Sequence, residues 1–163
     1  KGQGLVLAQS IRTNLILANM KGFSTGMFLN EKRIEDAGQK NIASLRIKTP
    51  SIDEIVGQLS GGNQQKVVIG KWVNTDADIF IFDEPTRGID VGAKVEVYNV
   101  MNSLVKQGKC VIMVSSEMPE ILGMSDRVIV MRGGEVMAEV DRDSEHFNQE
   151  DLMKAAWGGK LDD

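Results

Sequence analysis

Several features that would quickly narrow the class of protein are scarce in this sequence. One cysteine, Cys110, in 163 residues excludes an internal disulfide and is typical of a reducing compartment. Aromatic residues make up only 5% of the chain, so we expect a core of aliphatic side chains. The net charge of -4 provides no basic surface for nucleic acid, which we do not expect as a partner.

Long apolar runs are also missing. No stretch reaches the roughly 18 apolar residues of a membrane-spanning helix. Lys1–Gly4 is followed by only a short apolar stretch, so we also expect no secretory leader. Any membrane role would then be peripheral. With 163 residues, the chain can bury the core of one domain, or of one domain with a smaller lobe.

A third absence concerns phosphate binding. The loop G-x-x-x-x-G-K-[ST], the Walker A motif, needs a glycine five residues before a Gly-Lys pair and a Ser or Thr after it. The Gly-Lys pairs at Gly70, Gly108 and Gly159 have neither. The sequence therefore lacks a common cradle for the phosphates of a nucleotide.

The pattern of the sequence changes near residue 59. Before it, we expect mostly helices with glycine-rich joints, among them one from Glu31 to about Leu45 capped by Asn30, and a short one over Ser51–Val56. After it, a helix over Gln64–Val73 is followed by alternating strands and helices.

The centre of the chain predicts a βαβ unit. The apolar runs Ile79–Phe82 and Cys110–Val114 are typical of strands buried on both faces of a parallel sheet. Between them, Asp90 caps a predicted helix, and Gly108 suits the left-handed position that ends it. Such a unit requires parallel pairing of its two strands.

The end of the chain predicts a short helix, a two-stranded hairpin and a last helix. We expect them over residues 119–123, 127–131 with 135–140, and 149–157. The predicted fold is α/β, with a parallel-sheet core. Its expected parts are a helical subdomain (1–58), the sheet core with the hairpin (59–140), and a C-terminal helix and tail (141–163).

Two short segments indicate chemistry. Ser60, Gly61 and Gly62 directly precede a helix, where free N–H groups and the helix dipole favour an anion such as phosphate. Asp83 and Glu84 end a predicted strand, at the sheet edge where ligands bind. There a carboxylate can hold Mg²⁺, and a second can orient or deprotonate water. Taken singly, the plainer interpretations are a tight turn before the helix and an acid pair before a proline turn.

Together the segments resemble a known family. Leu59–Lys66 (LSGGNQQK), Asp83–Asp90 (DEPTRGID) and Val114–Glu120 (VSSEMPE) occur in the order and spacing of the signature loop, Walker B and the motif after it in ABC ATPases. They closely resemble the second nucleotide-binding half of the ATP-binding subunit of bacterial monosaccharide importers, of the ribose, galactose and xylose type. The resemblance extends to about Trp157 and implies a partial P-loop NTPase domain.

This resemblance implies a role for each candidate residue. ATP and Mg²⁺ would lie between two halves that meet head to tail, and Ser60–Gly62 would contact the γ-phosphate of the ATP held by the partner half. Asp83 would hold Mg²⁺ in this half's own site, Glu84 would activate water, and Asp90 would reach across the interface. Members of the family drive sugar uptake at the cytoplasmic face of the bacterial inner membrane. Their partners are transmembrane permease subunits and, indirectly, a periplasmic sugar-binding protein.

The sequence departs from the general pattern at two points. The position of a γ-phosphate-contacting histidine is Ser116, as in other sugar-importer second halves. The missing Walker A loop would lie upstream, so we expect no ATPase activity from this chain alone. Its strands would also lack neighbours on one edge and part of one face, so we expect self-association.

Two other functions stay open on the sequence. An ABC-type ATPase of DNA repair or translation usually carries coiled coils or basic surfaces, whereas this chain is short before the signature loop and acidic. A non-catalytic interaction module with the same fold would suit a chain without Walker A. His146 has no cysteine or second histidine near it, so we expect no metal site there. Cys110 is expected in the core, and Trp72 and Trp157 are expected where helices meet the sheet.

Overall fold

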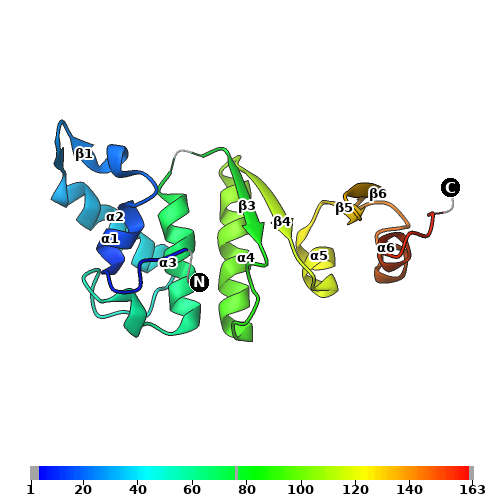
Figure 1. Cartoon of the computed structure of the whole chain (residues 1–163), viewed down its shortest axis with the longest axis horizontal. Coiled ribbons are helices and arrows are strands. Elements are labelled where there is room, and N and C mark those ends of the chain that lie inside the picture. The colour runs from blue at the N-terminus through cyan, green and yellow to red at the C-terminus, as the bar shows by residue number, and fades with distance from the viewer. Residues whose placement is uncertain (1–3, 76, 162–163) are drawn as a thin grey trace. The chain divides into compact units, whose positions relative to one another are not determined.

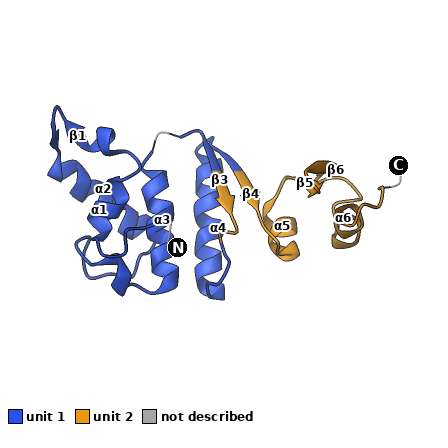
Figure 2. Cartoon of the chain, viewed as in Figure 1, with its two compact units in different colours: residues 1–80, 86–111 blue, residues 81–85, 112–163 orange. Residues whose placement is uncertain are grey.

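The computed structural model describes residues 4–75 and 77–161, which fall into two compact units (Figure 2). Unit 1 comprises residues 1–80 and 86–111, and unit 2 comprises residues 81–85 and 112–163. This division does not test the three parts expected from the sequence, which stay a prediction. It places the candidate site residues in two groups, one in each unit.

Figure 1 shows the helices and strands of the described residues and labels most of them. The helices are α1 (Ile11–Ile16), α2 (Glu31–Ser44), α3 (Gly61–Val73), α4 (Val91–Lys106), α5 (Met118–Met124) and α6 (Gln149–Ala156), with short 3-10 helices η1 (Met20–Phe23) and η2 (Val56–Gln58). The strands are β1 (Ser24–Thr25), β2 (Phe28–Leu29), β3 (Ile79–Asp83), β4 (Cys110–Val114), β5 (Arg127–Arg132) and β6 (Glu135–Asp141). They pair as β1–β2, β3–β4 and β5–β6.

The helical end of unit 1 has an aliphatic core, as the composition predicts. α1 packs against α2 and α3, and Ile11 and Leu15 of α1 are 0% and 2% exposed. Buried amides in this region are hydrogen bonded: Asn14 Oδ1 accepts the N–H of Val6 at 2.8 Å, and Asn41 donates to Asn74 Oδ1 at 2.8 Å. Asn30 caps α2 by accepting the N–H of Arg33, which confirms the predicted cap.

The helix expected over Ser51–Val56 is wrong. The backbone of this segment pairs with α1 instead, because Ile52 and Glu54 use their carbonyls to accept the N–H groups of Arg12 and Ile11, at 2.8 and 3.0 Å. Ile52 is 1% exposed and packs so closely that a Cβ at Gly38 would lie 2.9 Å from its Cγ2. Tertiary packing of one isoleucine outweighs local helix propensity here.

The β3–β4 sheet is parallel. The N–H of Cys110 donates to the carbonyl of Asp78 at 2.8 Å before the strands, and the N–H of Glu84 donates to Val114 at 2.9 Å after them. One bond joins the starts of the two strands and the other joins their ends, which is the parallel pairing that the βαβ pattern predicts. Asp90 caps α4 and Gly108 has φ +80 just beyond it, which confirms both predicted helix ends.

The expectation that these strands are buried on both faces is wrong. Every second side chain is exposed: Ile79, Ile81, Ile112 and Val114 are 60%, 70%, 47% and 51% exposed, whereas Phe80 is 7% exposed. Cys110 is exposed as well, so the expected core position is also wrong. The sheet has only two strands, so nothing in the described part of the chain covers this apolar row.

The end of unit 2 confirms the predicted hairpin and last helix. β5 and β6 pair antiparallel, and the turn uses Gly133 and Gly134 at φ +59 and +88, which glycine adopts without strain. α6 packs on this hairpin through Leu152, which is 2% exposed. Trp157 and Trp72 are 77% and 52% exposed, so the expectation that both pack where a helix meets the sheet is wrong.

Candidate functional site

The signature segment starts a helix earlier than the sequence predicts. α3 begins at Gly61, not Gln64, with Ser60 as an extended N-cap whose side chain accepts no backbone N–H of the first turn. The first intrahelical bond runs from the N–H of Gln64 to the carbonyl of Ser60 at 2.9 Å. The N–H groups of Gly61 and Gly62 therefore have no acceptor among the described residues, as expected for a first helical turn.

Polar side chains hold this turn in place. Asn63 is 9% exposed; its Oδ1 accepts the N–H of Lys48 at 2.9 Å, and its Nδ2 donates to Ser60 Oγ at 2.9 Å. Gln64 Nε2 donates to the carbonyl of Leu59 at 3.0 Å. These bonds fix the loop before α3, because each joins a side chain to the surrounding backbone or to the cap.

Gly62 lies against the start of α4. A Cβ at this glycine would lie 3.2 Å from the Cβ of Ala93 and 3.8 Å from Asp90 Oδ2. Asp90 Oδ1 in turn accepts the N–H of Ala93 at 2.9 Å, and this backbone bond is the main cause that lowers the pKa of Asp90. Unit 1 thus brings together two candidate residues, Gly62 and Asp90, that the sequence places on separate motifs.

A buried ion pair also joins α3 and α4. Lys66 is 5% exposed, forms a salt bridge with Glu96, and donates to the carbonyl of Arg46 at 2.7 Å. The sequence gave no signal for this contact, since nothing local indicates which carboxylate a helical lysine meets. The pair fixes the face of α3 that follows the signature turn.

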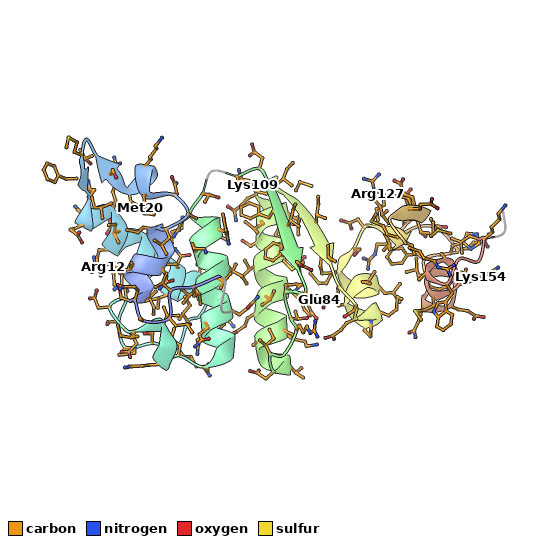
Figure 3. The ribbon with its side chains drawn as sticks, in the orientation of Figure 1. Arg12, Met20, Glu84, Lys109, Arg127 and Lys154 are labelled. Atoms are coloured by element: carbon orange, nitrogen blue, oxygen red, sulfur yellow. The ribbon has the colours of Figure 1, made fainter. Side chains whose placement is uncertain are left out.

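The acid pair lies at the carboxyl end of β3. Asp83 is the last residue of the strand and is exposed, while Glu84 is half-buried and follows it (Figure 3). Glu84 has φ 46, in the left-handed region that residues with a Cβ rarely adopt, and its N–H donates to the carbonyl of Val114 at 2.9 Å. This conformation turns the chain sharply away from the strand.

The turn after β4 carries a second set of polar groups. Ser116 is exposed, whereas the hydroxyl of the preceding Ser115 donates to Glu120 and accepts the N–H of Glu117 at 3.0 Å. Glu120 is only 3% exposed. The sequence alone assigns no role to Ser115 or Glu120, although a serine at the end of a strand and a glutamate in the first turn of the next helix can form such a pair.

The candidate residues form two groups, each described within its own unit. Ser60, Gly61, Gly62 and Asp90 belong to unit 1, and Asp83, Glu84 and Ser116 belong to unit 2. No cluster of three His, Cys, Asp or Glu side chains able to hold a metal occurs among residues 4–75 and 77–161. The oxygens of Asp83 suit Mg²⁺, but as one ligand of a site that needs several. No helix in the same residues is long and apolar enough to cross a bilayer.

Comparison with solved structures identifies the fold. An ATP-binding cassette of an ABC transporter in its ADP conformation aligns with a TM-score of 0.70 and 20% identity, over 94% of this chain and 61% of that one. A dimeric ATP-binding cassette bound to ADP and Pi aligns with a TM-score of 0.72 and 21% identity, over 86% of this chain and 60% of the other. The predicted fold class, a partial P-loop NTPase domain of the ABC ATPase type, is confirmed.

Comparison of sequences gives the family. The family model described as ABC transporter matches residues 5–87, half of the chain, and the chain belongs to that family. A putative ribose/galactose/methyl galactoside import ATP-binding protein from Rhizobium etli is 51% identical over 98% of this chain and 30% of its own length.

Other relatives agree. A xylose import ATP-binding protein from Moorella thermoacetica is 53% identical over 97% of this chain and 31% of its own length. The ribose import ATP-binding protein from Oceanobacillus iheyensis is 51% identical, over 98% of this chain and 32% of its length. The resemblance seen in the sequence is confirmed, and the chain spans about a third of these relatives.

Proposed function

We propose that this chain is part of the ATP-hydrolysing subunit that powers monosaccharide import by an ABC transporter. The observation that carries the proposal is identity of about half of all positions, across nearly the whole chain, with relatives named as ribose and xylose import ATP-binding proteins. The nature of the sugar does not follow, because no residue of the chain is argued to contact it.

The proposed chemistry uses the two residue groups in two different ATP sites. Ser60 and the N–H groups of Gly61 and Gly62 would bind the γ-phosphate of an ATP held by the partner half. Their support is the first turn of α3, where the N–H groups of Gly61 and Gly62 have no acceptor among the described residues. Asp90, whose carboxylate lies beside Gly62, would reach across the same interface.

The second group would serve the ATP of this half's own site. Asp83 would be one ligand of Mg²⁺, which when bound neutralises charge on the phosphates. Glu84 would accept a proton from, or orient, the attacking water. Ser116 stands where a histidine would contact the γ-phosphate, and a serine hydroxyl can donate there but carries no charge.

The partners follow from the same proposal. They are a partner nucleotide-binding domain, transmembrane permease subunits and, through these, a periplasmic sugar-binding protein, with the chain at the cytoplasmic face of the bacterial inner membrane. Residues 1–58 would be the helical subdomain that meets the permease. Residues 59–140 would be the catalytic core, and 141–163 a C-terminal helix and tail.

Without a Walker A loop, the chain alone is expected to be inactive and to self-associate. The exposed row on β3 and β4, which includes Ile81 at 70% exposure, is apolar surface that a second copy or missing strands would cover. Sedimentation that gives a compact monomer at all concentrations would count against self-association, though not against the ATPase assignment.

Nucleotide binding tests the proposal. The chain alone should not bind ATP measurably in titration calorimetry, whereas mixing it with an intact nucleotide-binding half should tighten ATP binding by that half. Gly61→Glu should remove the gain, because a carboxylate would face the phosphate. Gln58→Glu introduces the same charge on the exposed η2 turn and should keep most of it.

The alternative is a non-catalytic interaction module with the ABC ATPase fold. The observation that favours it is the missing Walker A loop. A mixture whose ATP affinity does not change, but in which the two chains still associate, would support the module and contradict the proposed role of Ser60–Gly62.

A further inference from the structure

We infer that Glu120 is a positioning residue for Glu84, and that it acts through Ser115 and the end of β4. The inference rests on the proposed function only for the importance of Glu84. The contacts themselves lie within unit 2 and are independent of nucleotide.

The first link is between Glu120 and Ser115. Glu120 is 3% exposed on α5, and glutamate is seldom buried without a specific partner. The hydroxyl of Ser115 donates to Glu120 Oε2 and accepts the N–H of Glu117 at 3.0 Å. A hydroxyl that donates and accepts at once has one preferred rotamer, so Glu120 fixes the conformation of the residue that follows β4.

The second link is between Ser115 and Glu84. The carbonyl of Val114 accepts the N–H of Glu84 at 2.9 Å. That carbonyl belongs to the planar peptide unit that joins Val114 to Ser115, so the orientation of one constrains the other. Anchoring Ser115 to Glu120 therefore anchors the acceptor of the Glu84 N–H group.

The third link is the strained backbone of Glu84. Its φ of 46 is a conformation that a residue with a Cβ keeps only where its surroundings demand it. The N–H of Glu84 donates to the carbonyl of Val114, and the Glu120–Ser115 pair holds the residue next to that carbonyl. Glu120 itself is buried in α5, so it supports the geometry of the site without reacting.

Amide hydrogen exchange of Glu84, measured by NMR on the chain without nucleotide, tests the inference. Glu120→Ala should speed exchange of the Glu84 amide roughly tenfold relative to the Val128 and Val140 amides of the β5–β6 hairpin, because a hydrogen bond that anchors its acceptor is lost. Glu120→Gln keeps an acceptor oxygen and should restore most of the protection. Ser115→Ala should match Glu120→Ala, and the double variant should add little to either.

Leu122→Ala is the matched control, since it removes an apolar contact of the same helix with the hairpin core and leaves the Ser115–Glu120 pair intact. It should change all the amides of unit 2 together. If Glu120→Ala speeds Glu84 exchange no more than Leu122→Ala does, Glu120 is merely part of the core and the inference is wrong. Because no nucleotide is present, that result would leave the proposed ATPase role standing, and a failed ATP-binding test would leave this result standing.

Discussion

The helical end of unit 1 and the β3–β4 sheet are both built from aliphatic side chains, but only the first buries them. Ile11 and Leu15 are 0% and 2% exposed, whereas Ile79 and Ile81 are 60% and 70% exposed. Helices α1, α2 and α3 cover one another, while a sheet of two parallel strands cannot cover its own second face. The helical end therefore supplies its own core, and the sheet that carries Asp83 needs surface from outside the described residues.

Shortening an aliphatic side chain should give the largest difference between the two regions in the free energy of unfolding. Leu15→Ala should lower the free energy of unfolding by about 3–5 kcal/mol, because it leaves a cavity in a closed core. Ile81→Ala, which removes atoms from an exposed side chain, should cost about 0.5 kcal/mol or less. Urea denaturation followed by circular dichroism would measure both, and equal losses would mean that the sheet face is covered in solution.

Ion pairs in the two regions should also contribute differently to the free energy of unfolding, but by a smaller amount. Arg12 joins Glu35 at 2.6 Å, Asp53 at 2.8 Å and Glu31 at 3.1 Å, with its side chain 25% exposed. Asp53 first, and then Glu35, raise the pKa of Arg12, so the guanidinium stays charged at every pH of interest. Arg12→Ala should cost about 1–3 kcal/mol, since one side chain ties α1 to α2 and to the loop before η2.

The control for Arg12 lies beside the sheet. Lys109 pairs with Asp78 at 2.8 Å, but Asp78 is 88% exposed, so solvent screens the pair. Lys109→Ala should give no measurable change in the urea midpoint. A loss comparable with that of Arg12→Ala would show that the edge of the sheet is more protected than its exposure implies.

A pH titration gives the smallest effect, at the cap of α4. The bond from the N–H of Ala93 is the main cause that lowers the pKa of Asp90 from its ordinary 3.8. A lowered folded-state pKa means that the carboxylate stabilises the fold above pH 3.8, and that this contribution is lost as the pH falls through the folded-state value.

Asp90→Asn isolates this contribution. Asparagine also caps helices, so the variant should be nearly as stable as the parent chain at pH 7. The urea midpoints of the parent and the variant should then converge further between pH 7 and pH 3, because only the parent loses the contribution of the carboxylate. Parallel curves over the whole range would contradict the stabilising contribution of the Asp90 carboxylate.

Much of the fold follows from local sequence, because several elements have local signals at their ends. Asn30 and Asp90 cap α2 and α4 as predicted, Asn148 caps α6, and Gly133-Gly134 forms the hairpin turn. The prediction of a helix over Ser51–Val56 is wrong because carbonyls of this segment accept N–H groups of α1, which is far away in sequence. No local pattern indicates such a contact. The prediction that β3 and β4 are buried on both faces is wrong because the apolar content of a strand does not indicate which neighbouring elements cover it.

The candidate site was predictable as residue types but not as geometry. The order of the motifs predicted Ser60–Gly62, Asp83 and Glu84 as site residues. It did not predict the close approach of Gly62 to Asp90, or the left-handed backbone of Glu84. These depend on contacts between separate segments, as does the buried pair of Ser115 and Glu120.

The central claim is that the acids at the end of β3 and the amides at the start of α3 belong to ATP pockets that protein outside this chain must complete. Steady-state phosphate release from ATP and Mg²⁺ tests it most directly, measured on the purified chain and on its Glu84→Gln variant. We expect both to release phosphate only at the background rate. Steady release by the parent chain that Glu84→Gln abolishes would show a complete catalytic site within these residues and would contradict the claim.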